Sequence, residues 1–207
     1  MSIIILDYGL GNVGSISNML KHINVRHSIE STDKSKIFSA KGLILPGVGN
    51  FSRAMSILES SGVGEIIREA VLVKKIPILG ICLGMQLMCK HSEEGNIAGL
   101  GLIDADVVKF SKDSSNKLKI PHMGWSYVDI VKDTILTSGL LKNPRYYFVH
   151  SYFVKCNDKS DILMSCNHGD DFTACFVKEN IMGCQFHPEK SHKFGIDLFQ
   201  NFVDWCR

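Results

Sequence analysis

The sequence predicts an α/β fold in which a mostly parallel central sheet is flanked by helices and continued by antiparallel strands towards the C-terminus. In the N-terminal half, short runs that are apolar throughout alternate with segments of helical spacing, as expected for parallel strands buried on both faces. In the C-terminal half, strand-like segments follow one another with only turns between them. No linker rich in proline, glycine or serine separates the halves, so residues 1–207 are expected to form one domain.

The N-terminal half contains four expected strands, at residues 3–6, 26–30, 42–46 and 76–81. Residues 15–20 have the spacing of an amphipathic helix. Residues 51–74 are expected to be helical with an interruption near Gly62, because glycine is a poor helix former. A further helix is expected directly after Cys82. This alternation of strands and helices is the reason for expecting parallel pairing.

The C-terminal half contains six expected strands, at residues 107–110, 127–130, 146–149, 162–164, 174–177 and 181–186. The chain is expected to close with a helix at residues 195–205. The apolar stripe of this helix comprises Phe194, Leu198, Phe199 and Phe202. Such a stripe packs a helix against a core. These strands are therefore expected to extend the sheet as an antiparallel region of the same domain.

The composition is that of an ordinary globular domain, with 45% hydrophobic and 21% charged residues and a net charge of +2. Such a small net charge gives no indication of a nucleic-acid or membrane partner. The first apolar run ends at Asp7, lacks a basic leader and is too short for a signal peptide or a membrane span. We therefore expect a cytoplasmic protein.

The seven cysteines are an odd number, which argues against a disulfide framework. Neither a C-x-x-C motif nor a Cys/His spacing suited to zinc occurs, so no metal is expected. Six of them are expected to be small buried apolar residues: Cys89, Cys156, Cys166, Cys175, Cys184 and Cys206. Cys82 lies in a different context.

A glycine-rich segment, Gly9-Leu10-Gly11-Asn12-Val13-Gly14, has the G-x-G-x-x-G spacing of a dinucleotide-binding loop. Glu30 even lies at a suitable distance to bind a ribose. Against this interpretation, the Asp7 carboxylate would repel a bound pyrophosphate, and the later strands do not form a second nucleotide-binding half. We expect these glycines to permit a tight turn between strand and helix instead, without a cofactor.

Cys82 is the centre of the sequence Gly80-Ile81-Cys82-Leu83-Gly84, which has the G-x-nucleophile-x-G arrangement of a strand-to-helix elbow. The glycines remove Cβ atoms where the strand and helix crowd together. The sulfur is expected at a helix N-terminus, where free N–H groups favour the thiolate, and the Leu83 N–H can donate to an oxyanion. Gln86 lies one turn later on the same helix face, within reach of a substrate bound at the sulfur.

A thiolate nucleophile needs a base, and the chain offers His187 in a His-Pro-Glu segment. Pro188 disfavours a helical conformation for His187, so His187 and Glu189 are expected to lie in an extended segment and point to the same side. The carboxylate can then orient the imidazole and stabilise its cationic form, completing a Cys–His–Glu triad. The other seven histidines show no metal-ligand spacing, and most are expected at the surface or in loops.

Residues 80–86 (GICLGMQ) and 186–189 (FHPE) resemble the corresponding motifs of the class I, or triad, glutamine amidotransferases. Residues 7–12 (DYGLGN), 45–49 (LPGVG), 121–125 (PHMGW) and 149–152 (VHSY) narrow the resemblance to the glutaminase subunits of imidazole glycerol phosphate synthases. The resemblance extends from residue 5 to the final helix. It implies the flavodoxin-like fold of that family.

In that family the subunit hydrolyses glutamine to glutamate and passes the ammonia to a separate synthase (cyclase) subunit, with which it forms a heterodimer in histidine biosynthesis. The resemblance implies the same activity here, without a cofactor. It also implies that the Val48 N–H joins the Leu83 N–H in an oxyanion hole. Because Val48 lies between two glycines, its peptide plane can rotate at little steric cost. We expect this N–H to turn inward when the partner is loaded with ligand.

The resemblance also implies which residues hold the substrate and which face the partner. Glutamine would be held by Gly49, Gln86, Glu94, Ser151 and Tyr152, although the adjacent Glu93 could take the place of Glu94. The partner would face Asn12, Pro121, His122, Met123, Gly124 and Trp125. The alternative for residues 122–125 is a plain β-turn with a packed indole.

The sequence departs from the commonest family pattern at Val13-Gly14, at Asn50 and at residues 191–194 (SHKF). These positions lie near the expected partner and oxyanion surfaces and not in the triad. A paralogous glutaminase subunit, which supplies ammonia to an enzyme that makes an acetamidino sugar for surface polysaccharide, is therefore an alternative. Alternatives from other classes are a cysteine peptidase, an inactive binding module and a dinucleotide-dependent oxidoreductase.

Overall fold

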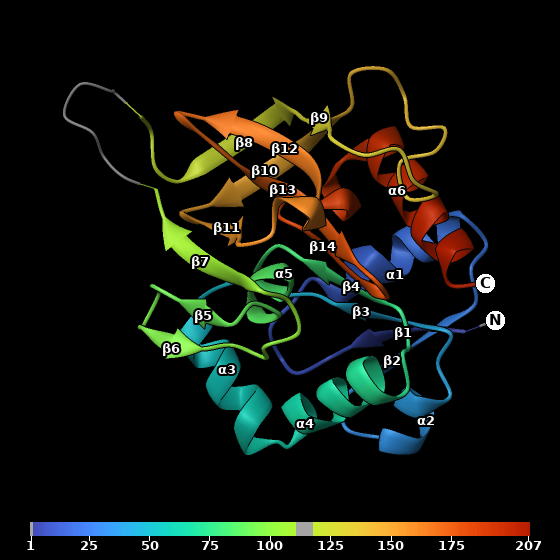
Figure 1. The fold of residues 1–207 in the computed structure, drawn as a ribbon. Coiled ribbons are helices and arrows are strands. Elements are labelled where there is room, and N and C mark those ends of the chain that lie inside the picture. Colours follow the sequence, from blue (N-terminus) through green and yellow to red (C-terminus); the bar gives the residue numbers. More distant parts are fainter. Residues whose placement is uncertain (1, 111–117) are drawn as a thin grey trace.

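The computed structural model describes residues 2–110 and 118–207, and a large mixed sheet of twelve strands forms the centre of this part of the chain (Figure 1). Five neighbouring strands are parallel: β2 (His27–Glu30), β1 (Ile3–Leu6), β3 (Gly42–Leu45), β4 (Ile78–Ile81) and β14 (Ile181–Cys184). Their alternate side chains enter two separate cores, since Ile4 packs on one face of the sheet and Ile5 on the other.

The sheet continues from β14 through β13 (Asp170–Lys178) and β11 (Tyr152–Cys156) to β7 (Ala105–Lys109), and each successive pair of these four strands is antiparallel. The short strands β5 (His91–Ser92) and β6 (Ile97–Ala98) form one edge. At the opposite side of β13, β12 (Ile162–His168) pairs with β13, and β9 (Asp129–Ile130) pairs with β12. The antiparallel strands thus extend the parallel sheet within one continuous core.

Helices cover both faces of the parallel strands (Figure 1). One core receives side chains of α2 (Lys34–Phe38), α3 (Phe51–Ser60), α4 (Val63–Arg68) and α5 (Leu83–Leu87), the helix that follows Cys82. The other receives α1 (Val13–His22) and α6 (His192–Trp205). Three short elements complete the chain: the π-helical turn η1 (Glu69–Val73) and the 3₁₀ turns η2 (Lys159–Asp161) and η3 (Pro188–Lys190).

A second, two-stranded sheet is formed by β8 (His122–Tyr127) and β10 (Arg145–His150), which pair antiparallel with His122 opposite His150. Its inward side chains join the core that α1 and α6 cover, where Phe148 packs edge-on against Phe172 of β13. The outward side of the pair carries Met123 and Trp125, both exposed. This small sheet therefore presents one face to the core and one to solvent.

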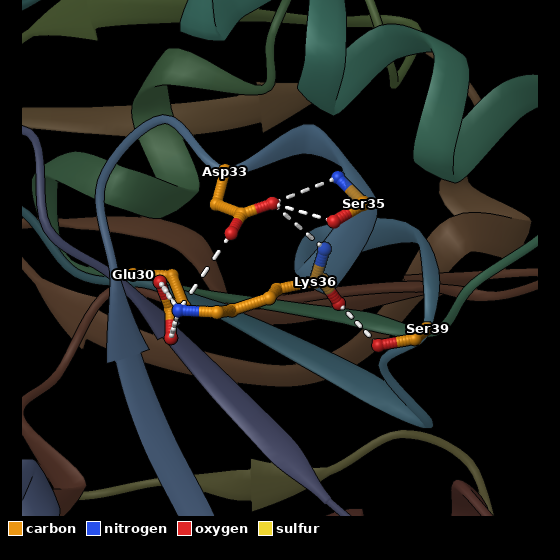
Figure 2. Close-up of polar contacts among 5 residues, drawn as sticks. All are labelled: Glu30, Asp33, Ser35, Lys36 and Ser39. Atoms are coloured by element: carbon orange, nitrogen blue, oxygen red, sulfur yellow. Dashed lines mark hydrogen bonds and ion pairs between the residues drawn. The ribbon is translucent and has the colours of Figure 1, made fainter.

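Helix α2 follows from local capping chemistry that Figure 2 shows. The Asp33 carboxylate accepts hydrogen bonds from the backbone N–H groups of Ser35 and Lys36, both at 3.1 Å, and so satisfies two free donors of the first turn. The hydrogen bond from the Ser35 hydroxyl, followed by that from the Lys36 N–H, lowers the pKa of Asp33. Lys36 also pairs with Glu30 at the end of β2, at 3.1 Å, which ties the helix to the sheet.

The structure confirms the expected fold class, the four N-terminal strands and the helix break at Gly62, where φ is +71°. Three expectations about elements were wrong. The strand expected at 127–130 is divided between the last residue of β8, Tyr127, and β9, and residues 122–125 form strand and not a turn. Strand β14 is parallel to β4 and belongs to the parallel region. Strands β8 and β10 form their own sheet and do not extend the central one. Among the described residues, no helix has the length and apolar character that crossing a membrane requires.

Candidate active site

Cys82 lies at a strained elbow between β4 and α5, with φ +53° and ψ −110°. Its N–H donates to the Cys184 carbonyl at 2.8 Å, which continues the pairing of β4 with β14 up to the nucleophile. Gly84 lies so close to the chain after β3 that an added Cβ would meet the Leu45 carbonyl oxygen at 1.9 Å. The elbow therefore depends on glycine for close packing, as the sequence predicted.

His187 and Glu189 face each other behind the cysteine. The His187 Nδ1 lies 2.8 Å from a Glu189 carboxylate oxygen, and both side chains are buried. Nε2 is thereby left for the Cys82 sulfur, whose interaction with the imidazole raises the pKa of His187. The His187 N–H donates to the Tyr147 carbonyl at 2.9 Å, so β10 fixes the backbone of the base. This is the geometry of a Cys–His–Glu triad.

The triad favours a charged imidazole. Burial alone would lower the pKa of His187, but hydrogen bonds and charge interactions with Cys82 and Glu189 outweigh it and raise the pKa to about 10. A protonated imidazole at neutral pH stabilises a neighbouring thiolate and holds the proton that a leaving group needs. The arrangement can therefore attack an acyl carbon and then protonate the departing nitrogen.

A pocket of about 400 Å³ opens at the sulfur. Its volume is at the lower end of those typical for small-molecule sites. The sequence-predicted residues that line it are Val48, Gly49, Cys82, Leu83, Gln86, Glu94, Pro121, Ser151, Tyr152 and His187. The structure thus brings together the nucleophile, the base, both expected oxyanion residues and all five residues expected to hold glutamine. Two further lining residues, Val149 and His150, were not among the predicted site residues.

The geometry separates Glu94 from its neighbour Glu93. Glu94 lines the pocket, and its carboxylate accepts hydrogen bonds from the Phe51 N–H at 3.0 Å and the Asn50 side-chain amide at 2.9 Å. The Glu93 carboxylate instead accepts from the Lys109 N–H at 2.7 Å, beside β7. Only Glu94 of the two is placed to contact a ligand. Asn50, one of the unusual positions of this sequence, caps α3 and orients that carboxylate.

The loop of residues 46–49 lies against the elbow. At Gly47 an added Cβ would meet the Gly84 nitrogen at 2.6 Å and the Tyr8 hydroxyl at 2.9 Å. The Tyr8 hydroxyl donates to the Pro46 carbonyl at 2.9 Å, and burial, reinforced by the nearby Cys82, raises the pKa of Tyr8 so that it stays a neutral donor. Val48 is partly exposed at the mouth of the pocket. Val48 and Leu83 therefore both line the pocket that opens at the sulfur.

The residues expected at a partner surface do not all reach the surface. Met123 and Trp125 are 63% and 42% exposed, and the Trp125 ring stacks on His192 with centroids 5.7 Å apart. His122, in contrast, is only 4% exposed, because its ring turns inward and pairs with His150 at 3.1 Å. Asn12 caps α1 by accepting from the Ser15 N–H at 3.4 Å. The His122 side chain therefore belongs to the interior.

The expectation that most remaining histidines lie at the surface or in loops was wrong for His122 and His150, both of which are buried strand residues. Burial is the first cause that lowers their pKa values, to about 4 and about 3. Both rings are therefore neutral at physiological pH. The alternation of Tyr146, Phe148 and His150 along one face of β10 was the sequence feature that could have revealed His150.

The glycine-rich loop does not have the features of a dinucleotide site. The Gly9 N–H, at φ +88°, donates to the Asp7 carboxylate at 3.0 Å, and an added Cβ at Gly11 would lie 2.8 Å from Pro46. Glu30, the expected ribose ligand, is paired with Lys36 (Figure 2). These glycines allow a tight turn and close packing beside the active site. All seven cysteines in the described residues are free and buried, as expected for the six outside the elbow.

Comparison with known proteins agrees with this geometry. The family described as glutamine amidotransferase class-I matches residues 4–205. Imidazole glycerol phosphate synthase subunit HisH 2 of Methanococcus maripaludis is 51% identical over 97% of this chain and 98% of its own length. The subunit of the same name in Pseudomonas aeruginosa is 46% identical over 98% of each chain. In fold alone, the chain resembles PurLQS from Thermotoga maritima, with a TM-score of 0.74 at 17% identity over 100% of this chain and 99% of that one.

The match to the family covers nearly the whole chain, and the elbow cysteine faces a buried histidine–glutamate pair as that family requires. The chain therefore belongs to the class I glutamine amidotransferase family.

Proposed function

We propose that this chain is the glutaminase subunit of an imidazole glycerol phosphate synthase, which hydrolyses glutamine and delivers ammonia to a cyclase subunit for histidine biosynthesis. The observation that carries the proposal is the pocket in which Cys82, His187 and Gln86 meet. The relatives named above, one of them 51% identical over nearly the full length, support the choice of synthase. We further propose that residues 1–207 act as one catalytic domain in the cytoplasm, as half of a heterodimer.

The proposed reaction begins with attack of the Cys82 thiolate on the side-chain amide carbon of glutamine. The N–H groups of Val48 and Leu83 stabilise the oxyanion of the tetrahedral intermediate. His187 gives its proton to the amide nitrogen, the C–N bond breaks, and ammonia leaves a thioester on Cys82. His187 then takes a proton from water, which attacks the thioester. The thiolate is restored as the leaving group, and the new side-chain carboxylic acid releases one proton to solvent as glutamate departs, so atoms and charge balance.

Glu94 supplies the charge that an amino-acid substrate requires. Of the described residues that line the pocket, it is the only acid. A carboxylate oriented by Asn50 and the first turn of α3 can bind the α-ammonium group of glutamine in this pocket.

Glu94→Gln is expected to raise KM for glutamine by about tenfold or more and to leave kcat within about threefold, because only a charge contact to the α-ammonium group is lost. Steady-state glutamate release gives both constants. Glu93→Gln, which changes the neighbouring carboxylate that bonds to β7, is the matched control and is expected to keep the wild-type KM. A raised KM in the control alone would assign the contact to Glu93.

The outer face of β8 supports a protein partner close to this pocket. Met123 and Trp125 are exposed there, and the Arg145 guanidinium lies 5.5 Å from the centre of the Trp125 ring. Exposed aromatic, methionine and arginine side chains of this kind are enriched in interfaces. Pro121, directly before β8, also lines the pocket. A partner seated on this face would therefore contact the wall of the glutamine site.

Reconstitution with the cyclase subunit from the same source is expected to accelerate glutamate release by about 100-fold once the acceptor ribotide is bound. The reason is that the Val48 N–H completes the oxyanion hole only in the loaded complex. Glutamate release and formation of imidazole glycerol phosphate are measured together. A chain that is fully active alone would contradict the conditional oxyanion hole.

A second acceptor is favoured by one observation. The two relatives named above are both called subunit HisH 2, and the number distinguishes them from another subunit of the same kind. A paralogue that supplies ammonia to an enzyme making an acetamidino sugar is therefore the second candidate. Acceleration of glutamate release by such a sugar-modifying enzyme, and not by the cyclase subunit, would establish it in place of the first.

A further inference from the structure

Gln185 places a side-chain amide beside the nucleophile. It lies between the end of β14 and His187, is fully buried, and its Nε2 is 3.8 Å from the Cys82 sulfur. Its backbone N–H donates to the Ala174 carbonyl at 2.9 Å, which fixes the residue to β13. Buried polar side chains are normally hydrogen-bonded, and one of the hydrogen-bond partners of Gln185 is the Cys82 sulfur.

The orientation of the Gln185 amide follows from a backbone carbonyl. The side-chain nitrogen of Gln86 lies 2.9 Å from the Tyr152 carbonyl oxygen, which can only accept, so that group must be an NH₂. The same nitrogen lies 3.0 Å from Gln185, and the atom facing it must also be an acceptor, which makes it Oε1. The other end of the Gln185 amide, the donor Nε2, therefore faces the sulfur.

The anchoring carbonyl is itself held in place. The His150 Nδ1 donates to the Tyr152 oxygen at 2.8 Å, and the His150 Nε2 accepts from the His122 Nδ1 at 3.1 Å. Burial lowers the pKa of His150 to about 3, so this ring stays neutral and keeps one donor and one acceptor. The chain of contacts that turns Gln185 towards Cys82 is thus fixed at both ends.

We propose that Gln185 is a further catalytic residue, which donates a hydrogen bond to the Cys82 thiolate and holds it for attack. This role rests on the proposed glutaminase function. A neutral thiol at this position can donate to the Val149 carbonyl, 4.0 Å away, whereas a thiolate can only accept. Among the described residues, Gln185 has its amide nitrogen within hydrogen-bonding distance of the sulfur, and the protonated His187 interacts with the same atom.

The titratable groups that interact with the Cys82 sulfur are His187 at the start of η3, Tyr8 from the segment after β1 and Cys184 from β14. Among the described residues, Glu94, His150 and Tyr152 line the same pocket. Glu189 acts on the sulfur through His187. Neither an amide nor a thioether titrates, so replacing Gln185 with methionine adds no new ionisation and changes only the balance between thiol and thiolate at Cys82.

The test measures the rate at which iodoacetamide alkylates Cys82 as a function of pH, read from the mass of the Cys82 peptide in the full chain. Gln185→Met keeps the length of the side chain and removes the donor. Its half-maximal alkylation is expected about one pH unit higher than in the wild type, corresponding to a loss of about tenfold in the thiolate population. Gln200→Met on α6 is the matched control and is expected to follow the wild-type curve.

A folded Gln185→Met variant with the wild-type alkylation curve would overturn the proposal. If far-UV circular dichroism shows that this variant does not fold, Gln185→Leu carries the test, because it also lacks the donor and adds no ionisable group. Its curve is expected to move upward as well, and an unchanged curve would again overturn the role. Alkylation needs neither glutamine nor a partner, so this outcome is distinguishable from failure of the proposed function.

Discussion

Cys82→Ala is expected to reduce glutamate release from glutamine by about 10³-fold or more, because no other group in the pocket can form the thioester. Alanine keeps the Cβ and removes only the sulfur, so the elbow at φ +53° places the same demand on the backbone. Release of glutamate is measured by a coupled enzymatic assay in the presence of the synthase partner. Thermal unfolding should show that the variant remains folded.

Cys166→Ala provides the matched control for the loss of the nucleophile. Cys166 is buried in β12, away from the pocket, and burial raises the pKa of its thiol to about 12, so it is an inert neutral group at physiological pH. This variant is expected to retain wild-type turnover. If Cys82→Ala kept a tenth or more of the wild-type rate, the assignment of the nucleophile would be wrong.

Glu189→Gln is expected to lower kcat by about 10²- to 10⁴-fold with a smaller change in KM, because the residue contacts the base and not the substrate. Burial opposes a charge on His187, and the Glu189 carboxylate is one of the two partners that offset it and raise the pKa to about 10. The neutral amide removes this contribution, so the pKa of His187 falls. The imidazolium form is then lost at a lower pH as pH rises.

The pH dependence of kcat distinguishes this effect from a loss of structure. In the wild type the thiolate–imidazolium pair is expected to persist until the pH approaches 10, and in Glu189→Gln the alkaline limit should move down. Glu179→Gln, an exposed glutamate paired with Lys75, is the matched control and should keep the wild-type profile. If the alkaline limit of kcat in Glu189→Gln were the same as in the wild type, Glu189 would not be a residue that raises the pKa of His187.

The chemistry of the site was predictable from sequence because it lies in two short segments. The glycines around Cys82 mark the elbow, and the His-Pro-Glu spacing places His187 and Glu189 on one side of an extended segment. Of the residues expected to hold glutamine, Gln86 followed from its position one turn after Cys82, and the others were accessible only through family resemblance. Their contacts join distant parts of the chain, as in the hydrogen bond from Gln86 to the Tyr152 carbonyl.

Other features were not predictable, because they depend on contacts between distant parts of the chain or on a single local capping interaction. Gln185 gains its place beside the sulfur from Gln86, a contact across 99 positions of sequence. Residues 122–125 follow Pro121 and contain Gly124, as turns often do, yet pairing with β10 makes them strand. The five-residue helix α2 depends on a single capping carboxylate, that of Asp33. Helices this short carry little periodicity to detect.

The most direct test of Cys82 as the nucleophile is to detect the covalent intermediate. The chain, together with its synthase partner and acceptor, is given glutamine labelled with ¹⁴C in its carbon skeleton, and turnover is stopped with acid. Label is expected on the Cys82 peptide as a thioester, and mild alkali should release it as glutamate. In Cys82→Ala no bound label is expected. Glutamate formation with no label on the wild-type Cys82 peptide, or with label on another residue, would contradict this role of Cys82.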